Sequence, residues 1–412
     1  MTRALLVAAS VYDGRRGTSQ SSVEDAHELS QLASAAGLDG LAIKTMRVRA
    51  AHPATFFGAG GVDALCALAA EVRADMIVVN RDLTAMQSRN LEVAVGRAVL
   101  DRSGLILDIF ARRARTHESK TQVELARSQR HLSRLAGLWS HLERQRGGIG
   151  VRGGPGEKQI ELDRRQTGEK IRRLRLRIDR LQSRGDSARK RRRKNGVLSA
   201  AIVGYTNAGK STLFNSLTRA AAPANDRMFD TLELKSRRMY LDGGTSSSSA
   251  NGGGFGDNNN DNDNVNMAAA DNINAVISDT VGFIRELPHE LVSGFAATLR
   301  DSADSDLLLI VADAASGEWR RQLSVVMATL AQIGAAQVPH LLVMNKSDRV
   351  ANAAAVMDDY DTNGGYGDGD ADIDIASAVW ISAKTGAGMD NLRRRLRDCL
   401  GRIRRGGFAG QK

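Results

Sequence analysis

Short apolar runs alternate with helical patterns along residues 196–400. A run of strand length followed by apolar residues every three or four positions is typical of a strand followed by a helix. The alternation therefore predicts an α/β fold, here a doubly wound domain. The candidate strands are Leu198–Val203, Arg238–Leu241, Ala275–Asp279, Leu307–Ala312, His340–Asn345 and Ala378–Ser382.

Residues 1–104 show the same two patterns on a smaller scale. The opening stretch MTRALLVAASVYDG has the alternation of a first strand, and Ala74–Asn80 has the continuous apolar character of a buried one. Gly61–Val72 between them has a helical pattern. This segment is expected to form a small α/β domain with a parallel sheet.

Residues 105–195 have helical periodicity alone. Between Val123 and Leu142 apolar residues recur at broadly helical spacing, and the glycine-rich stretch Gly147–Glu157 follows. A second helical pattern then repeats as a heptad seam, with the members Ile171, Leu174, Ile178 and Leu181. Two helices joined by a glycine-rich loop most simply form an antiparallel helical hairpin.

Low-complexity segments interrupt the C-terminal domain at Gly243–Asp271 and Asp358–Asp374. Their glycine, serine, asparagine and aspartate residues cannot bury enough apolar surface to offset the entropy of ordering, so we expect disordered surface loops. The first insert falls in hairpin position between two adjacent strands, where a long loop is tolerated. Residues 401–412 form a basic tail.

The charge balance favours a polyanionic partner, with 58 lysines and arginines against 47 aspartates and glutamates and a formal net charge of +11. Fifteen of the basic residues lie between Arg164 and Lys194, opposed there by three acids. A charge run commonly forms only a solvated helix face followed by a linker. This run has too few acidic residues to neutralise its basic ones through salt bridges, which favours contact with a phosphate backbone.

The rest of the composition bears on the compartment, on membrane spans and on the mode of RNA binding. Its two cysteines, Cys66 and Cys399, give no disulfide framework, which favours a reducing compartment such as a cytoplasm or an organellar matrix. No apolar run reaches the roughly 18 residues of a membrane span. With 4% aromatic residues, base stacking is not expected as the main mode of RNA binding. We expect a monomer.

The stretch GYTNAGKS, Gly204–Ser211, has the spacing of a phosphate-binding loop. Its glycines let backbone N–H groups turn toward phosphates at a helix N-terminus. Lys210 would reach the β- and γ-phosphates, and Ser211 would ligate Mg2+. The strand before it and the helical pattern after it argue against a chance glycine loop. The candidate phosphate-binding residues are Gly204, Tyr205, Thr206, Asn207, Ala208, Gly209, Lys210, Ser211 and Thr212.

The motif NKSD, Asn345–Asp348, follows a predicted strand downstream of the phosphate loop, and in this context it predicts selection of guanine over adenine. A carboxylate at Asp348 can accept both N1–H and the exocyclic N2–H, which adenine does not present together. Asn345 and the stem of Lys346 would complete the base site. After the last strand, Ser382, Ala383 and Lys384 would support the guanine O6 through a backbone amide and a lysine stem.

The segment DTVGF, Asp279–Phe283, stands between these motifs. Asp279 would hold the Mg2+ shell, and the Gly282 N–H would sense the γ-phosphate. Thr231 is the candidate for the threonine that caps Mg2+ when triphosphate is bound. Thr218 is the alternative, but it falls in the helix after the phosphate loop, where a structural role is expected.

Two positions bear on the rate of hydrolysis. Phe283 replaces the water-orienting glutamine that many GTPases carry, so intrinsic hydrolysis should be slow unless a partner positions the water. Asn207 could hold a K+ ion near the phosphates, or it could simply tolerate a tight turn; the two interpretations carry equal weight. The candidate catalytic residues are therefore Asn207, Lys210, Thr231 and Gly282.

Three longer runs, together with these motifs, resemble the HflX-type GTPases, within the larger group whose phosphate loop carries this asparagine. They are RNLEVAVGRAVLDRSGLILDIFARRARTHESKTQVELA (Arg89–Ala126), GGIGVRGGPGEKQIELDRR (Gly147–Arg165) and DTVGFIRELPHELVSGFAATL (Asp279–Leu299). The resemblance extends from Phe56 to Leu400. It implies a GTPase domain after an N-terminal domain and a hairpin with a glycine-rich tip.

The resemblance also implies a partner, the large ribosomal subunit near its peptidyl-transferase region, and a role in splitting or rescuing stalled ribosomes. The N-terminal domain and hairpin would meet ribosomal RNA. Some members are said to use ATP through the N-terminal half, although no second nucleotide motif occurs in residues 1–104. The candidate RNA contacts are Arg152, Arg164, Arg165, Arg172 and Arg173.

The chain departs from the family pattern at two places. Glu233-Leu234 replaces the usual Asp-Pro step after the first switch threonine, and Ala59 and Gly61 replace two lysines of the N-terminal domain. Two alternatives to the ribosome hypothesis remain at this point. One is a GTP-regulated RNA-binding module for RNA maturation or assembly, and the other is a nucleotide-binding scaffold that does not hydrolyse.

Overall fold

The computed structural model describes residues 2–11, 20–145, 155–218, 228–229, 235–241, 273–285, 302–350 and 377–406. The chain packs as two compact units. The first is Met1–Gly185 with Asn225–Glu233 and Glu286–Ala297, and the second is made of the remaining segments. The two predicted inserts, the tail beyond residue 406, Thr231 and Arg152 lie outside the described residues.

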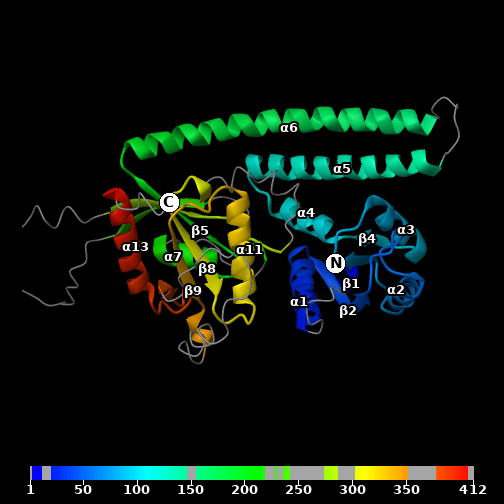
Figure 1. The fold of residues 1–412 in the computed structure, drawn as a ribbon, viewed down its shortest axis with the longest axis horizontal. Coiled ribbons are helices and arrows are strands. Elements are labelled where there is room, and N and C mark those ends of the chain that lie inside the picture. Colours follow the sequence, from blue (N-terminus) through cyan, green and yellow to red (C-terminus); the bar gives the residue numbers. More distant parts are fainter. Residues whose placement is uncertain are drawn as a thin grey trace, which may run out of the picture. The chain divides into compact units, whose positions relative to one another are not determined.

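The first unit begins with a four-stranded parallel sheet in the order β2-β1-β3-β4 (Figure 1). This confirms the predicted small α/β domain, because β1 carries a run of seven buried residues in its middle and helices follow the strands. Its elements are β1 (Thr2–Val11), α1 (Gln20–Ala35), β2 (Leu38–Val48), α2 (Ala59–Glu71), β3 (Met76–Val79), α3 (Ala85–Val95) and β4 (Ala98–Leu100).

Three helices complete the first unit and lead out of it: α4 (Arg102–Arg113), α5 (His117–Gln145) and α6 (Pro155–Lys194). Asp101 caps α4 by accepting a hydrogen bond from the Gly104 N–H at 3.0 Å. Leu105, Ile109 and Phe110 on one side of α4 are buried, as expected for an amphipathic helix.

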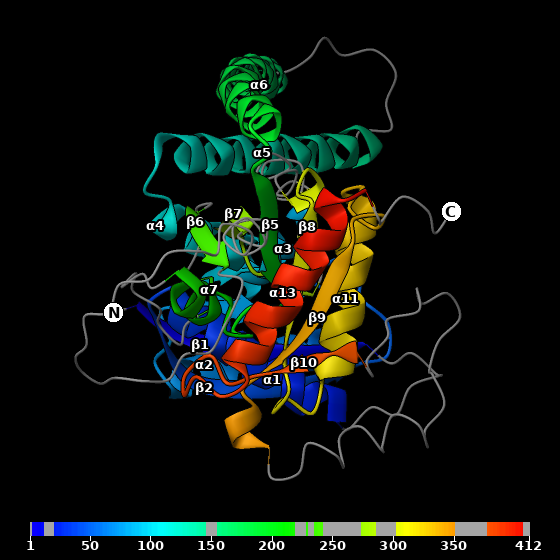
Figure 2. The ribbon, with the colours of Figure 1, turned by 90° about the vertical axis from the view of Figure 1, so that its left-hand side faces the viewer.

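Helices α5 and α6 run in opposite senses, as the hairpin prediction requires. His117 of α5 contacts Arg177 of α6, and Glu124, which comes later on α5, pairs with Lys170, which comes earlier on α6. The order of the contacts is therefore reversed between the two helices. Figures 1 and 2 show that the two helices cross at an angle, so their apolar seam is short. It is made of Leu125, Leu132, Ile171, Leu174 and Ile178.

The described part of the second unit holds a six-stranded sheet in the order β10-β9-β8-β5-β7-β6. All neighbours are parallel except β6 and β7, which confirms a doubly wound domain with a hairpin at one edge. The strands are β5 (Leu198–Gly204), β6 (Lys235–Leu241), β7 (Ile273–Asp279), β8 (Leu307–Asp313), β9 (His340–Asn345) and β10 (Val379–Trp380). Helices α7 (Lys210–Thr218), α11 (Trp319–Gln332) and α13 (Met389–Arg404) accompany them, with a 3-10 turn at η2 (Ser347–Arg349).

The bounds of several predicted strands needed adjustment: β7 begins at Ile273 rather than Ala275, and the changes at β6 and β10 are the most informative. β6 begins three residues before the predicted Arg238, because its antiparallel ladder with β7 continues to Lys235 opposite Asp279. β10 is shorter than the predicted Ala378–Ser382. The Ile381 N–H still donates to the Met344 carbonyl at 2.9 Å, but Ser382 donates instead to the Ala387 carbonyl, so the chain has already turned.

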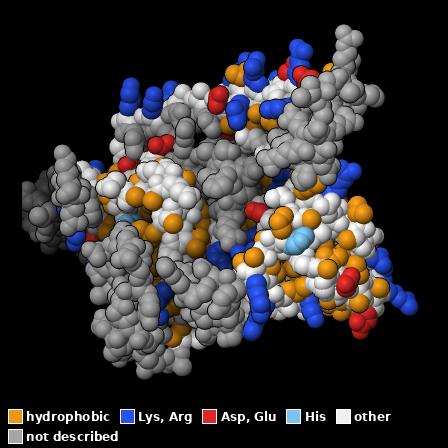
Figure 3. All heavy atoms as spheres, turned by 45° about the vertical axis from the view of Figure 1, so that its right-hand side comes forward, with side chains coloured by type: hydrophobic (Ala, Val, Ile, Leu, Met, Phe, Trp, Pro, Cys, Tyr) orange, Lys and Arg blue, Asp and Glu red, His pale blue; other side chains and the backbone are white. Residues whose placement is uncertain are grey.

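The exposed surface of α6 is strongly basic, although Leu162 and Leu176 are also exposed on it. Lysine and arginine side chains gather along the hairpin in Figure 3, and Arg164, Arg165, Arg172 and Arg173 are all exposed. No helix among the described residues is long and apolar enough to cross a membrane.

Candidate nucleotide-binding site

The loop after β5 is built from backbone conformations that ordinary side chains resist. Gly204 has a φ of +153°, and a Cβ there would lie 2.2 Å from the Val311 carbonyl oxygen. Gly209 has a φ of +90°, and a Cβ there would lie 2.2 Å from the Asn345 Nδ2 atom. Asn207 between them has a φ of +63°, a region that asparagine tolerates better than most residues. The sequence motif therefore folds into a tight turn at the carboxyl end of a central strand.

Lys210 begins helix α7 and folds its side chain back over this loop. Its Nζ atom donates to the Tyr205 carbonyl at 2.7 Å, and the residue is only 7% exposed. Burial lowers the pKa of the amine to about 8, opposed by the negative Asp279 and assisted by the positive Lys346. Gly282 allows this approach, because a Cβ there would lie 2.8 Å from Lys210 Nζ.

Two oxygen groups meet beside the lysine. The Ser211 hydroxyl donates to Asp279 Oδ2 at 2.7 Å, and Asp279, at the end of β7, is fully buried. Hydroxyl and carboxylate oxygens are the ligands that Mg2+ prefers. No cluster of three or more His, Cys, Asp or Glu residues suited to a metal occurs in the described residues.

The residues after β7 are tied to the phosphate loop by main-chain hydrogen bonds. The Phe283 N–H donates to the Gly204 carbonyl at 3.0 Å, and the Thr206 N–H donates to the Phe283 carbonyl at 2.8 Å. The Phe283 side chain is 1% exposed. A phenyl ring with no polar atom and no access to solvent cannot orient water.

Asn345 joins the phosphate loop to the NKSD motif, to which it belongs, and to the SAK segment. This residue at the end of β9 is 2% exposed. Its Nδ2 donates to the Ala208 carbonyl at 2.8 Å, and its Oδ1 accepts from the Ala383 N–H at 3.0 Å. Three segments that are far apart in sequence thus meet at one buried amide.

Lys346 and Asp348 follow on the same loop. Lys346 has a φ of +63°, and its ammonium pairs with Asp313 Oδ2 at 2.7 Å. Asp348 is exposed, and a hydrogen bond with the Ser382 side chain, with smaller contributions from nearby groups, lowers the pKa of its carboxyl. Ser382 is buried and Lys384 is exposed at the adjoining turn.

Sequence analysis missed two residues that support this arrangement. Asp313 pairs with Lys346, and the Ser216 hydroxyl donates to the Ala383 carbonyl at 2.9 Å. Asp313 directly follows the predicted strand Leu307–Ala312 and ends β8 in the structure, and that place was the only signal for it; Ser216 carries none. The structure brings together the predicted residues of the phosphate loop, Asp279, Gly282 and the two guanine motifs. It does not test Thr231, which lies outside the described residues.

Three family models match successive parts of the chain. The N-terminal region of GTP-binding GTPases matches residues 23–111, their middle region matches residues 113–192, and the 50S ribosome-binding GTPase domain matches residues 199–346. Among solved structures, a GTP-binding protein from Sulfolobus solfataricus in complex with GDP aligns with 98% of this chain and 100% of its own, at 20% identity and a TM-score of 0.45.

Relatives that match most of the chain show its family. The GTPase HflX of Magnetococcus marinus is 40% identical over 376 residues, which span 91% of this chain and 77% of the relative. The GTPase HflX of Escherichia coli is 39% identical over 383 residues, which span 93% of this chain and 80% of the relative. With the phosphate loop, the buried Asn345 junction and the Asp348 loop in place, the chain belongs to the HflX family, whose members are GTPases that act on GTP.

Proposed function

We propose that this GTPase uses its nucleotide state to control docking on the large ribosomal subunit, through the N-terminal domain and the hairpin, in ribosome splitting or rescue. The observation that carries the nucleotide half of the proposal is the junction at Asn345. Its two hydrogen bonds hold the phosphate loop at Ala208 and the SAK segment at Ala383 in one frame. A ligand that fits this frame has phosphates at one end and a purine at the other.

The guanine end of the frame is assigned to Asp348. Ionisation of its carboxyl is favoured by the Ser382 hydrogen bond, so at neutral pH it is an acceptor for two donors of the base. The Lys346 stem would lie against the purine ring, held there by the ion pair of its ammonium with Asp313. The Ala383 segment and Lys384 would complete the contact with the base.

The phosphate end is assigned to residues 204–212, with Lys210 as the cation that reaches the β- and γ-phosphates. Ser211 and Asp279 would hold Mg2+ there, together with Thr231. When bound, the metal would neutralise charge on the phosphate oxygens during transfer to water. Asn207 would contact a K+ ion through its amide oxygen, which turnover in potassium compared with sodium buffer can test.

Slow intrinsic hydrolysis is proposed from Phe283. Its ring is buried and its main chain is fixed to Gly204 and Thr206, so it has neither the chemistry nor the freedom to position water. We infer that a partner supplies this function, and that ribosomes raise the rate of GTP hydrolysis.

The partner is inferred from the hairpin and from the relatives. Arg165 and Arg173, each 81% exposed, flank Glu169 at distances of 3.7 and 3.6 Å, which leaves most of their charge available to a phosphate backbone. The family model of the C-terminal domain is described as a 50S ribosome-binding GTPase. Arg164 and Arg172 would contact RNA from the same helix, and Arg152 from the loop before it.

Co-sedimentation with purified large ribosomal subunits tests the partner. We expect binding with a non-hydrolysable GTP analogue and weaker binding with GDP. The Arg165→Ala/Arg173→Ala double variant should bind less tightly and show a shallower dependence on salt. Failure to co-sediment in either nucleotide state would remove the ribosome proposal. If binding to unrelated RNA then persisted, it would favour an RNA-binding module instead.

A base-swap experiment tests the guanine site separately. Asp348→Asn replaces the carboxylate by an amide that presents a donor, so affinity should shift from GTP toward xanthosine triphosphate. Asp390→Asn, at an exposed residue of α13, is the matched control. Unchanged GTP affinity in the Asp348 variant would contradict this assignment.

A further inference from the structure

The side-chain hydroxyl of Thr206, in the phosphate loop, is buried and has no hydrogen-bond partner among the described residues. The residue is 6% exposed, and its main-chain N–H already donates to the Phe283 carbonyl at 2.8 Å. A buried hydroxyl that forms no hydrogen bond destabilises the fold. Such groups are uncommon in native proteins, and they mark places where the partner is a ligand or a bound water.

Buried threonines elsewhere in the same unit are bonded to the main chain. The Thr280 hydroxyl donates to the Ile202 carbonyl at 2.7 Å, and the Thr329 hydroxyl donates to the Val325 carbonyl at 2.8 Å. Both residues are buried to a similar degree as Thr206. Within the part of the chain that the structure describes, the Thr206 hydroxyl forms no such bond.

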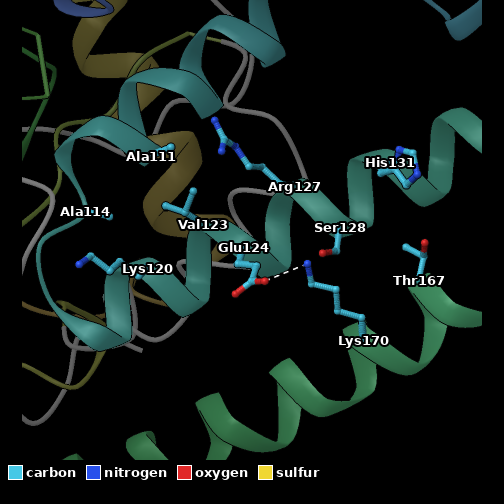
Figure 4. A pocket seen from close by; sticks show the side chains of 10 residues that line it. All are labelled: Ala111, Ala114, Lys120, Val123, Glu124, Arg127, Ser128, His131, Thr167 and Lys170. Atoms are coloured by element: carbon cyan, nitrogen blue, oxygen red, sulfur yellow. Dashed lines mark ion pairs between the residues drawn. The ribbon is translucent and has the colours of Figure 1, made fainter.

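Polar side chains that line an open cavity have solvent as an alternative partner. A cavity of about 550 Å³ lies where α5 and α6 cross, and at its edge Lys170 and Glu124 form an ion pair at 2.8 Å (Figure 4). Each of these two side chains is about half-exposed, so water completes their hydrogen bonds. The Thr206 hydroxyl is closed to solvent and lacks this alternative.

Thr206 lies beside the groups that we assign to the γ-phosphate. A Cβ added to Gly282 would lie 2.9 Å from Thr206 Cγ2 and 2.8 Å from Lys210 Nζ, so the two side chains flank one glycine. The Gly282 N–H is the proposed sensor of the γ-phosphate, and Lys210 is the cation proposed to reach it. A phosphate group bound there would therefore come close to the Thr206 side chain.

Hydrogen bonds on both sides hold Thr206 in this place. The Phe283 N–H donates to the Gly204 carbonyl at 3.0 Å, and the Thr206 N–H donates to the Phe283 carbonyl. The Arg285 N–H then donates to the Tyr205 hydroxyl at 3.1 Å. Threonine is also branched at Cβ, which restricts its side chain. The side chain is thus positioned against the segment after β7 before any ligand binds, as electrostatic catalysis requires.

We propose that the Thr206 hydroxyl takes part in GTP hydrolysis by bonding to the γ-phosphate and to the water that attacks it. In many GTPases a glutamine after the glycine orients this water, and Phe283 lacks the chemistry for it. Thr206 supplies a polar group from the other side of the main-chain bridge. A hydroxyl can donate to a phosphate oxygen while it accepts from water. This inference rests on the proposed nucleotide site.

The chemical step needs no proton from Thr206. The water oxygen forms a bond to the γ-phosphorus while the bond to the β–γ bridging oxygen breaks, and GDP leaves with that electron pair. One water proton passes to a γ-phosphate oxygen, and the other stays on the new P–OH group. The hydroxyl accepts a hydrogen bond from the proton that stays, and so orients the attacking oxygen. A partner that stimulates hydrolysis would act on a water already held in this way.

Single-turnover hydrolysis of GTP labelled in its γ-phosphate, with the full chain in excess, tests the proposal. Thr206→Val keeps the shape and removes the hydroxyl, so the rate at saturation should fall about ten- to hundredfold. GDP affinity should stay unchanged, because GDP has no γ-phosphate. Thr206→Ser keeps the hydroxyl and should retain most of the rate. Thr329→Val, on α11 of the same unit, is the matched control and should hydrolyse GTP at the unaltered rate.

Thermal unfolding without nucleotide separates this role from a structural one. Thr206→Val removes a hydroxyl that has no partner, so it should be at least as stable as the unaltered protein, whereas Thr329→Val loses a hydrogen bond and should unfold at a lower temperature. A full rate in Thr206→Val, or an equal loss of rate in Thr206→Ser, would overturn the proposal. Failure of the unaltered protein to bind GTP would instead remove the proposed nucleotide site itself.

Discussion

Asn80 and Asn345 stand at corresponding places in the two sheets, each at the carboxyl end of a buried strand that pairs with parallel neighbours. They are 3% and 2% exposed, and both form hydrogen bonds with main-chain groups through their side-chain amides. Asn80 Oδ1 accepts from the Ala9 N–H at 2.7 Å, which joins two neighbouring strands of one sheet. Asn345 instead joins two loops that come from different parts of the chain. Asparagine at this position therefore links two strands in the N-terminal sheet, whereas in the C-terminal sheet it holds together the loops of the candidate nucleotide site.

The surroundings of the two asparagines explain the difference. Beyond β3, the Arg81 side chain donates to the Ala9 carbonyl at 3.1 Å, and Asp101 accepts from the Gly104 and Leu83 N–H groups while pairing with Arg130. The polar groups at this end of the N-terminal sheet are therefore already paired with other groups of the protein. Beyond β5, Gly204 and Gly209 have positive φ and fold the backbone into the tight turn proposed to bind phosphate. Similar folds therefore do not imply similar sites.

The largest effect should come from removing the glycine that begins the phosphate loop. In Gly204→Ala, the new Cβ would meet the Val311 carbonyl, so we expect a loss of about 3 kcal/mol or more in the free energy of unfolding. GTP binding should fall beyond detection. Gly60→Ala on α2 is the control, because nothing lies within 4 Å of that position. Urea unfolding of the control should show an equal or slightly raised stability.

The second test compares the two asparagines directly. Asn345→Ala and Asn80→Ala each leave a buried main-chain group without its partner, so each should lower the free energy of unfolding by about 1–3 kcal/mol. Only the Asn345 variant should also lose GTP affinity, because only there does the amide hold the phosphate loop. Equal loss of GTP affinity in both variants would contradict the distinction between the sheets.

The third test concerns the pH dependence of binding. Burial lowers the pKa of Lys210 to about 8 in the unliganded protein, and the phosphates of bound GTP raise it again. The complex then holds a proton that the free protein has lost above pH 8, so GTP affinity should fall as pH rises from 7 to 9, by about tenfold.

Lys210→Arg separates this effect from titration of the base. Arginine stays charged throughout that range, and loss of the guanine proton affects both proteins equally. The variant should therefore show the flatter profile in a calorimetric titration. Parallel profiles would mean that Lys210 does not titrate there.

The smallest effect is expected from Asp313. Asp313→Asn removes the carboxylate that holds the Lys346 ammonium, with both side chains less than one-fifth exposed at 15% and 18%. GTP and GDP affinity should both fall by about three- to tenfold, with an unchanged turnover number at saturation. A drop in turnover number at saturating GTP would place Asp313 in the chemical step instead.

The sequence was enough to predict the turn of the phosphate loop, because the residues that form it are close together in the chain. Gly204, Gly209 and Lys210 are close in the chain, and the strand and helix that orient them adjoin the motif. The contact of Asp313 with Lys346 could not be read in this way. It depends on the register of β8 and β9, which puts Asp313 opposite Asn345 and was unknown before the sheet was assembled.

The N-terminal sheet shows a second limit. The strand β2 has seven exposed residues along its length and lies at the sheet edge. It therefore lacks the apolar run or regular alternation that reveals a strand. The hairpin shows the opposite case: Ile171, Leu174 and Ile178 were predicted from their spacing and are buried together. The angle at which α5 and α6 cross is not encoded by periodicity (Figure 2).

The short main-chain bridge between Tyr205 and Phe283 has a consequence for observing this protein at work. The amide protons of Thr206 and Phe283 are both shielded in it, and both flank the residues that would contact phosphate. A shift of the Gly282 peptide toward the γ-phosphate would strain the bridge. Deuterium uptake at those two amides would then time the opening and closing of the site, without any label on the nucleotide.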